Sequence, residues 1–529
     1  MCIALRPFHL FLPLILLLSL ATPSLAGTLQ VPTQFATIQA AIEASVDGDT
    51  IEIAAGTYVE NISTLGKAIT LSGAGVGATI IDGSGATFGA DLGSTVRIDS
   101  GEGPATILEF LTITGGTGSL QPSGQRWGAG ILALETRPTL RHLEVIGNSV
   151  TIGRGAGAYL IIPGGDYTLS DCVFRQNVGG SGTGCYLTGV ETALVENCEF
   201  AENTLGLAGG GIRLSAVHAT IRDCVFRDTV PEMQFTVGAG LLVINDTGAP
   251  PVETVLVERC EFSRNVSGDQ GGALTVLSDF TTVRDCTFTE NQARDGSAIL
   301  NDRSQISVER CVFFGNTSQV GGSILMTINA VVLNIDHSTF ASETAPELVN
   351  TNFGFTMTNS IAWDVPPLAV PSVTVNVSNS IIEGGAPGVG NLDADPQFVD
   401  LAGGDLRLTA GSPAIDAGSE SSPLDPDGSI ADIGALPFFQ AQFRRGDVNL
   451  DSMIDVADPL FIFGDFFFDG DPVACDAAAD GNDDGLLNIA DPVYLLNFLF
   501  QGGPPPPAPN ECGLDPTPDL GCEAETTGC

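Results

Sequence analysis

The chain repeats one short stretch, Asp171-Cys172-Val173-Phe174-Arg175-Gln176-Asn177, and this repetition decides the fold. Five further copies keep the Cys and the Phe two residues after it, and four of those keep the Asn as well. The cysteines of the six copies are separated by 26, 26, 36, 26 and 25 residues and are Cys172, Cys198, Cys224, Cys260, Cys286 and Cys311. A period of this size is typical of a solenoid, in which each repeat buries its apolar face against its neighbours.

A second signature follows each Cys by about ten to fifteen residues. It is a Gly-rich turn that runs into a short apolar strand, as in Gly209–Leu214 and Gly271–Val276. Runs such as Ala219–Ile221 are β-branched, and no helical period of 3.6 residues appears in the repeats. Short strands separated by Gly and Asn predict an all-β parallel β-helix. A leucine-rich repeat is excluded because its helix and its Leu/Asn pattern are absent.

The repeated positions predict columns of like residues along the solenoid. The Cys and Phe columns should point inward, where each Phe contributes roughly 1.5–3 kcal/mol by burial. We expect the cysteines of this column to stay reduced and to pack as small hydrophobes. The Asn column predicts a ladder of turns, because Asn tolerates a left-handed backbone and bonds its own main chain.

Charges alternate in sign in the two columns that precede the Cys. Opposite charges would then lie about 4.8 Å apart on neighbouring coils, and each such pair contributes roughly 0.2–1 kcal/mol. This structural interpretation is favoured over a catalytic one for the Arg-Asp neighbours at 222–223 and 284–285. The first column is Glu196, Arg222, Glu258, Arg284 and Glu309, and the second is Asp223, Arg259, Asp285 and Arg310.

Composition and the N-terminus predict an exported protein. Residues 1–26 read as a signal peptide, with Arg6, an apolar run and a small-residue cleavage site. No later run of eighteen apolar residues exists, so no membrane span is expected. The net charge of −43 argues against nucleic acid or an anionic membrane as a partner. Four cysteines in loop-like sequence are the disulfide candidates, with their pairing left open: Cys475, Cys512, Cys522 and Cys529.

Both ends of the solenoid carry further motifs. A short amphipathic helix is expected over Ala36–Ala44, where it would plug the open end of the apolar core. The pieces Phe35–Ile42, Gly48–Ile51 and Gly56–Asn61 resemble the N-terminal cap of pectate-lyase-like right-handed β-helix proteins. Asp395–Ala435 resembles the C-terminal segment of secreted bacterial β-helix proteins. The resemblance covers most of residues 28–437 and implies a right-handed β-helix over 27–437.

A different composition begins near residue 438. Two Asp/Asn-rich loops, 33 residues apart, place oxygen ligands at positions 1, 3, 5, 9 and 12, the spacing that Ca²⁺ prefers. In the first loop Ser452 stands where the sixth-position Gly is usual, which predicts a weaker site. The expected ligands are Asp447, Asn449, Asp451, Asp455 and Asp458 in the first loop and Asp480, Asn482, Asp484, Asn488 and Asp491 in the second.

Each loop ends in Asp-Pro, which predicts helices over Leu460–Phe468 and Val493–Phe500. Two loop–helix units of this kind over 438–501 resemble the dockerin type I module, an EF-hand-like domain. The resemblance implies a need for calcium and a cohesin-like protein partner. Loop positions 10 and 11 depart from the hydroxyl residues of cellulosomal dockerins, because they are Val456-Ala457 and Ile489-Ala490. The Pro-rich stretch 502–529 is a stiff tail.

No recognisable catalytic motif of a β-helix lyase or hydrolase is present, and the histidines His9, His142, His218 and His337 stand apart. We therefore expect a non-catalytic protein that binds polysaccharide or another extended ligand. A polysaccharide lyase or glycoside hydrolase remains the alternative, with its site in one of two irregular insertions. These are Thr229–Thr254 and Gly116–Gly128, the second of which holds Arg126 and Trp127. A mechanical adhesin without glycan affinity is a third possibility.

Overall fold

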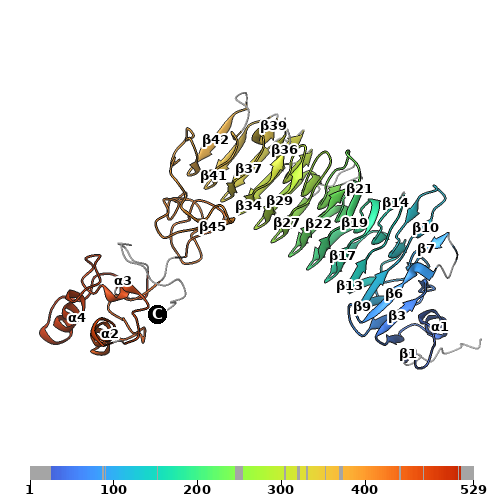
Figure 1. Ribbon diagram of the computed structural model, residues 1–529, viewed down its shortest axis with the longest axis horizontal. Helices are drawn as coiled ribbons and strands as arrows, with labels where there is room; N and C mark the ends of the chain where they lie inside the picture. The colour runs from blue at the N-terminus through green and yellow to red at the C-terminus, as the bar shows by residue number, and fades with distance from the viewer. Residues whose placement is uncertain are drawn as a thin grey trace, which may run out of the picture.

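The computed structural model describes residues 26–85, 89, 91–151, 153–244, 254–302, 305–318, 322–328, 332–351, 353–368, 373–439, 442–468, 470–509 and 511–513. The signal peptide expected at 1–26 lies outside these residues except for Ala26. Residues 28–382 form a right-handed parallel β-helix of about twelve coils, which Figure 1 shows as one long stack of strands. The predicted fold class of the solenoid is therefore confirmed.

The coils contribute strands to up to four faces, which we number 1 to 4 in chain order within a coil. Faces 1 and 2 run into one another in the long strands β19 (Cys185–Glu196) and β22 (Ile212–Arg222), which pair in parallel along most of their length. Face 3 begins after the repeated Cys, as in β20 (Glu199–Ala201), and face 4 follows it, as in β21 (Thr204–Ala208). Because the strands are parallel and stacked coil on coil, a residue contacts its counterparts one coil before and one coil after.

The strands fall on these faces as follows. Face 1 holds β4 (Ile62–Ser63), β8 (Val96–Ile98), β12 (Ile131–Leu134), β15 (Ala158–Ile161), β25 (Leu241–Ile244), β28 (Leu274–Leu277), β32 (Ile299–Asp302), β36 (Ser323–Ile328) and β39 (Glu347–Thr351). Face 2 holds β1 (Thr28–Val31), β2 (Thr50–Ile53), β5 (Thr70–Gly73), β16 (Asp166–Ser170), β26 (Thr254–Glu258), β29 (Phe280–Arg284), β33 (Gln305–Glu309), β37 (Val332–Asp336), β40 (Phe355–Thr358) and β42 (Val375–Ser378). The strands β9 (Ile107–Thr114) and β13 (Thr139–Ile146) continue from face 2 into face 3.

Face 3 otherwise holds β3 (Gly56–Val59), β6 (Thr79–Asp82), β17 (Val173–Arg175), β23 (Val225–Arg227), β27 (Glu261–Ser263), β30 (Thr287–Thr289), β34 (Val312–Phe314), β38 (Thr339–Ala341), β41 (Ile361–Trp363) and β43 (Ile381–Ile382). Face 4 holds short strands: β7 (Leu92–Gly93), β10 (Gly118–Leu120), β11 (Arg126–Trp127), β14 (Gly153–Arg154), β18 (Val178–Ser181), β24 (Val230–Pro231), β31 (Gln292–Ala293) and β35 (Thr317–Ser318). A 3-10 turn spans Gly83–Gly85.

The Phe and Cys columns are confirmed as the centre of the core. Seven rings from Phe174 to Phe340 stack with centroids 4.4–5.3 Å apart and planes within 6° of parallel. The six repeated cysteines and Cys185 are buried free thiols. Burial raises the pKa of the Cys172 thiol to about 12, because the thiolate would lose its hydration there. The Cys172 thiol therefore packs as a neutral apolar group.

The Asn column forms a buried ladder, but its mechanism differs from the expected one. Asn291 Nδ2 donates to Asn316 Oδ1 (3.0 Å) on the next coil and to Phe262 O (2.9 Å) on the previous one. The backbone of Asn291 is not left-handed; the preceding Glu290 has φ +55°. The expectation that each Asn supplies the left-handed turn and bonds its own main chain is wrong. The amides instead link successive coils, and the residue before each Asn turns the chain.

A second left-handed position precedes each repeated Cys. Asp223, Arg259, Asp285 and Arg310 all have φ between +49° and +54°. An L-residue in this conformation costs roughly 1–2 kcal/mol, because Cβ crowds the following carbonyl oxygen. Stacking of the coils therefore holds the second charge column in a turn that these residue types do not favour by themselves.

The N-terminal helix α1 (Ile38–Ala44) is confirmed two residues shorter than expected. It buries Ile38 and Ile42 against the first coils. Glu60 accepts hydrogen bonds from the N–H groups of Ile38 (2.8 Å) and Gln39 (3.0 Å), where a carboxylate suits the positive end of the helix. At the other end, the Lys67 ammonium donates to three carbonyl groups, including Glu43 O (2.9 Å).

At the C-terminal end the coils shorten and Ser replaces Cys at the repeated position. The backbone N–H of Ser338 donates to Ser360 Oγ (3.0 Å), and that of Ser360 donates to Ser380 Oγ (3.1 Å). Strands β44 (Phe398–Asp400) and β45 (Asp405–Leu408) pair antiparallel beyond the last coil. A separate apolar cluster closes this end and consists of Ile361, Ile381, Leu408, Ala414 and Ile433.

Among the described residues after the solenoid there are three helices: α2 (Ala457–Phe467), α3 (Asp476–Ala479) and α4 (Ala490–Gln501) (Figure 1). The first and last begin three residues before the expected starts, and α4 ends at Gln501, one residue beyond the expected Phe500, where Gly502 (φ +69°) follows it. The short α3 was not expected. Cys475 and Cys512 are disulfide-bonded, while Cys522 and Cys529 lie outside the described residues. Within the described part of the chain, no helix is both long and apolar enough to cross a bilayer.

Candidate functional site

The arginines that precede the repeated Cys are tied into ion pairs between coils. Arg222 Nη2 lies 2.6 Å from Glu196 Oε2, and Arg284 Nη2 lies 2.6 Å from Glu258 Oε2. The strand register places all five charges of this column beside one another in sequence order. The hydrogen bond from Arg284 outweighs burial and lowers the pKa of Glu258. The structural interpretation of this column is confirmed.

The second charge column is paired in the same way. Arg259 Nε and Nη2 donate to the two carboxylate oxygens of Asp223 at 2.8 and 2.9 Å. Arg310 holds Asp285 with the same two-point contact at 2.7 and 2.9 Å. In both columns each arginine pairs with a carboxylate on the preceding coil. Bidentate pairs of this geometry fix register and leave the guanidinium plane occupied, so these arginines do not present a free base to a substrate.

The described histidines are also accounted for. His142 stacks on Phe110 with centroids 5.1 Å apart, and His218 Nδ1 lies 2.9 Å from Thr254 Oγ1. His337 Nδ1 lies 3.0 Å from Asp336 Oδ2. Burial alone would raise the pKa of Asp336, but hydrogen bonds led by His337 lower it to about 2.

The insertion Gly116–Gly128 forms the hairpin of β10 and β11 on face 4. Trp127 does not stand free on it, because its ring packs on Tyr159 with centroids 4.8 Å apart. Tyr159 in turn packs on Tyr186 at 4.9 Å, and the Arg213 guanidinium lies 5.2 Å from the Tyr186 centroid. One face of Trp127 is therefore used inside the protein. Of the other insertion, Thr229–Thr254, the structure describes residues 229–244 and 254.

The two predicted calcium loops have matching backbones. Ser452 (φ +69°) and Gly485 (φ +77°) occupy the sixth position of the first and second loop, and both are left-handed. The fourth positions, Leu450 (φ +58°) and Asp483 (φ +60°), also match. Glycine adopts this conformation without the Cβ cost that Ser452 carries. The expected weakness of the first loop thus has a physical basis in its backbone.

The position-1 and position-12 carboxylates are fully buried in both loops. Asp458 Oδ1 accepts from Val448 N–H (2.7 Å), which ties the start of α2 to the start of the first loop. In the second loop Asp480 Oδ2 accepts from Gly485 N–H at 2.8 Å. Burial, helped by the nearby Asp480 charge, raises the pKa of Asp491 to about 6.

Three buried oxygens in these loops have no hydrogen-bond donor: Asp447 Oδ2, Asn482 Oδ1 and Asp491 Oδ1. Unpartnered buried oxygens are costly, and hard oxygen donors at alternating positions suit Ca²⁺. The donor chemistry of the ten predicted residues therefore fits this cation. Among the described residues, no three His, Cys, Asp or Glu side chains lie close enough together to hold a metal ion.

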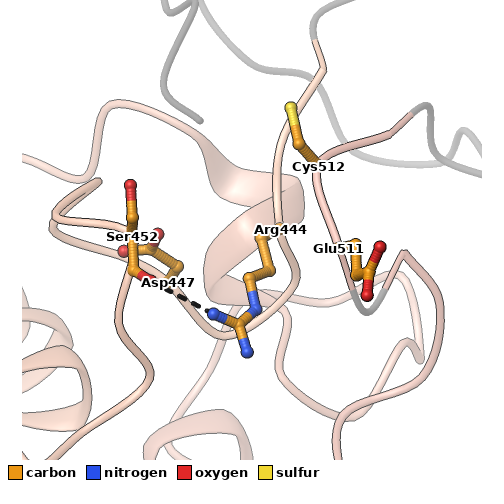
Figure 2. Close-up of a pocket in the computed structure, with 5 residues that line it drawn as sticks. All are labelled: Arg444, Asp447, Ser452, Glu511 and Cys512. Atoms are coloured by element: carbon orange, nitrogen blue, oxygen red, sulfur yellow. Dashed lines mark hydrogen bonds between the residues drawn. The ribbon is translucent and has the colours of Figure 1, made fainter.

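A cavity of about 320 Å³ opens beside the first loop (Figure 2). It is lined by Arg444, Asp447, Ser452, Glu511 and Cys512, and Arg444 Nη1 donates to Ser452 O at 3.2 Å. The cavity therefore joins the first loop to the C-terminal tail. Its lining mixes one cation with two carboxylates and carries no arrangement of catalytic groups.

Arg445 was missed by the sequence reasoning and is the largest fully buried side chain in the described chain. Its guanidinium donates to Ala477 O (2.9 Å) and Asp480 O (3.1 Å), and it pairs with Asp483 at 2.8 Å. It thereby anchors the second loop. The available signal was composition, since Arg444 and Arg445 are the only cations in a strongly acidic segment.

Comparisons with known proteins identify the solenoid only. A family model described as a right-handed beta helix region matches residues 127–288. The metabotropic glutamate receptor-like protein R of Dictyostelium discoideum is 25% identical over 181 residues, which are 34% of this chain and 11% of that protein. The chain thus spans about a tenth of the length of this relative.

Two solved structures match the chain at low similarity. Pectate lyase Pel9A is 14% identical with a TM-score of 0.34, covering 78% of this chain and 97% of that chain. A pectin methylesterase mutant in complex with a hexasaccharide is 11% identical with a TM-score of 0.21, covering 69% of this chain and 92% of that chain. Likenesses at these TM-scores carry no argument about the activity of this protein.

Proposed function

We propose that this chain is an exported, non-catalytic β-helix protein that binds polysaccharide and docks to a protein partner through a calcium-dependent, dockerin-like module at 438–501. The observation that carries the non-catalytic part is the pairing of the repeat arginines with carboxylates on neighbouring coils. A regular, rigid solenoid then offers a long surface to an extended ligand, in the way that other solenoids use theirs.

The docking role is supported by apolar side chains that recur in the two loop–helix units. Leu460 and Val493, one turn into α2 and α4, are 58% and 53% exposed. The loop residues ahead of them are exposed as well. Exposed apolar groups that recur on a small domain are typical of interaction surfaces, and this set differs from the hydroxyl residues that cellulosomal dockerins carry at loop positions 10 and 11. It consists of Met453, Val456 and Leu460 in the first unit and Leu486, Ile489 and Val493 in the second.

Calcium would be held by the ten loop residues named above. The ion would supply positive charge among buried carboxylates that otherwise repel one another. Asp458 and Asp491, as the position-12 residues, link each loop to the first turn of its helix. If calcium binds the folded module and not the unfolded chain, the free energy of unfolding rises with the logarithm of the calcium concentration.

The test of the module is a calcium titration of the melting temperature of the full chain. The parent should melt at a higher temperature in calcium than in EGTA. The double variant Asp447→Ala with Asp480→Ala should lose this difference, whereas the exposed Asp471→Ala, outside both loops, should keep it. A parent protein whose melting temperature ignores calcium would overturn the module assignment.

The test of the non-catalytic solenoid is a search for activity on a glycan panel, with and without calcium. Unsaturated products are followed by their ultraviolet absorbance, and hydrolysis is followed by reducing ends. We expect neither. Turnover that Arg222→Ala or Arg284→Ala abolishes would replace this proposal with a polysaccharide lyase or glycosidase.

A further inference from the structure

An excursion of the chain builds one wall of a groove on face 4. Glu232 N–H still donates to Leu205 O (2.8 Å) on the preceding coil, so the chain is in the sheet up to this point. It rejoins at Val237, whose N–H donates to Leu207 O at 3.0 Å. Residues 233–235 between these bonds are exposed, whereas Thr236 is buried. The excursion belongs to the longer, 36-residue step of the cysteine period.

The opposite wall comes from the next two coils. Ser267 N–H donates to Gln292 O (2.8 Å), and Arg294 N–H donates to Asp269 O (2.8 Å), which joins these coils edge to edge. Together the walls enclose a cavity of about 560 Å³, within the range of small-ligand sites. A Cβ on Gly268 would lie 2.6 Å from the carbonyl oxygens of residues 233 and 234, so only glycine lets the excursion pack this closely.

The groove presents a large aromatic ring to solvent. Phe235 is 76% exposed and Met233 is 54% exposed, and both line the cavity. Leu207 and Val230, on the same face, are 55% and 47% exposed. An apolar patch of this kind rimmed by polar side chains marks a binding surface. A free phenyl ring beside amide groups is suited to the apolar face of a pyranose, whose hydroxyls point sideways.

The charges in the groove select the class of glycan. Among the described residues that line it, Arg294 is the one cation, and its Nη1 lies 2.8 Å from Asp269 Oδ1. Glu232 adds a further negative charge. A uronate or sulfated sugar would bring its own anion to this carboxylate-rich site with no unpaired cation to receive it. Asp269 and Glu232 would repel that anion, so the groove favours uncharged sugars.

We propose that this groove is a glycan site that takes a neutral polysaccharide. Phe235 stacks on one sugar ring, while the amides of Gln234 and Gln292 and the Arg294–Asp269 pair bind its hydroxyls. This inference rests on the proposed glycan-binding function and adds the place of binding and the class of ligand. It locates the site on face 4, away from the arginine columns before the repeated cysteines.

The experiment is affinity gel electrophoresis of the full chain in gels that contain one polymer each. Hydroxyethylcellulose, arabinoxylan and galactomannan are the neutral probes, and polygalacturonate and alginate are the anionic ones. We expect at least one neutral polymer to retard the parent protein. Phe235→Ala should weaken that binding about tenfold or more, and Phe353→Ala, an equally simple change at a ring 50% exposed elsewhere, should not. Both rings are exposed, so both variants should have the melting temperature of the parent protein.

Other outcomes separate the two proposals. Retardation by a neutral polymer that Phe235→Ala leaves unchanged would overturn the groove and keep the glycan-binding function. Retardation by the anionic polymers alone would overturn the class of ligand assigned to the groove. Retardation by no polymer would overturn the glycan-binding function itself, and the groove assignment with it.

Discussion

The buried amide ladder makes Asn291→Ala the sharpest test of how the coils hold together. Asn291 is fully buried, and its side chain forms four hydrogen bonds that span three coils. Its Oδ1 accepts from the backbone N–H and from Nδ2 of Asn265, both at 3.1 Å. Its Nδ2 donates to Asn316 Oδ1 and Phe262 O. Alanine removes all four bonds at once.

The expected loss follows from these contacts. The Asn265 backbone N–H would keep no acceptor, and an unsatisfied buried donor costs roughly 1–3 kcal/mol. Each of the other three bonds contributes roughly 0.5–1.5 kcal/mol. Local relaxation recovers part of the sum, so we expect destabilisation of about 3–5 kcal/mol, at the upper end of single substitutions. Because the unfolding entropy grows with chain length, in a solenoid of this size that loss lowers the melting temperature by roughly 5 °C.

Scanning calorimetry and urea unfolding measure the effect, and Asn334→Ala is the matched control. Asn334 is exposed on β37, where its side chain accepts one hydrogen bond from Thr356 at 2.7 Å. The control should change stability by about 0.5 kcal/mol or less. Equal, small shifts for the two variants would refute the inference that the amide ladder carries inter-coil stability.

Three further substitutions test the columns of the solenoid by urea unfolding. Glu343→Gln addresses the end of the ladder, where the buried carboxyl accepts from Asn316 Nδ2 (3.0 Å) and burial raises its pKa. The folded state holds the Glu343 proton more tightly than the unfolded chain does, so the parent should lose stability as pH rises above roughly 4.3. The variant should lose less stability between pH 4 and pH 8. Parallel profiles of stability against pH for the two proteins would contradict this. Thr229→Asn should stabilise by about 1 kcal/mol, since Thr229 interrupts the ladder and its buried Oγ1 has no partner; destabilisation would show that the site cannot admit an amide. Arg284→Ala should cost about 1 kcal/mol, because Arg284 is 41% exposed and the buried Glu258 keeps Arg259 as a partner at 3.3 Å; a much larger loss would mean that Arg259 cannot compensate for the lost pair.

The sequence predicted the solenoid well because neighbouring coils place equivalent repeat positions in contact. The columns of Phe174 and Cys172 could be read from spacing alone, and so could the alternation from Glu196 to Arg222. Helix α1 was predictable from its apolar face. The Asn ladder was predicted in position but not in mechanism, because spacing does not show which residue of a turn takes the left-handed conformation.

The candidate sites were less predictable. The loop residues from Asp447 to Asp491 follow a spacing rule, and their calcium remains a prediction. The groove beside Phe235 lies where the period breaks, and an irregular excursion has no neighbouring copy from which its path can be read. The roles of Gly268 and Arg294 depend on that path, so spacing alone could not assign them.

The sequence by itself determined the residues that stack, because a constant period converts distance along the chain into contact between coils. Only the tertiary structure decided which way each arginine turns, which residue bears the left-handed turn and that Arg445 is buried. Those outcomes depend on how backbone and side chains share the space between particular coils and loops. This packing depends on contacts between residues that are far apart in the chain.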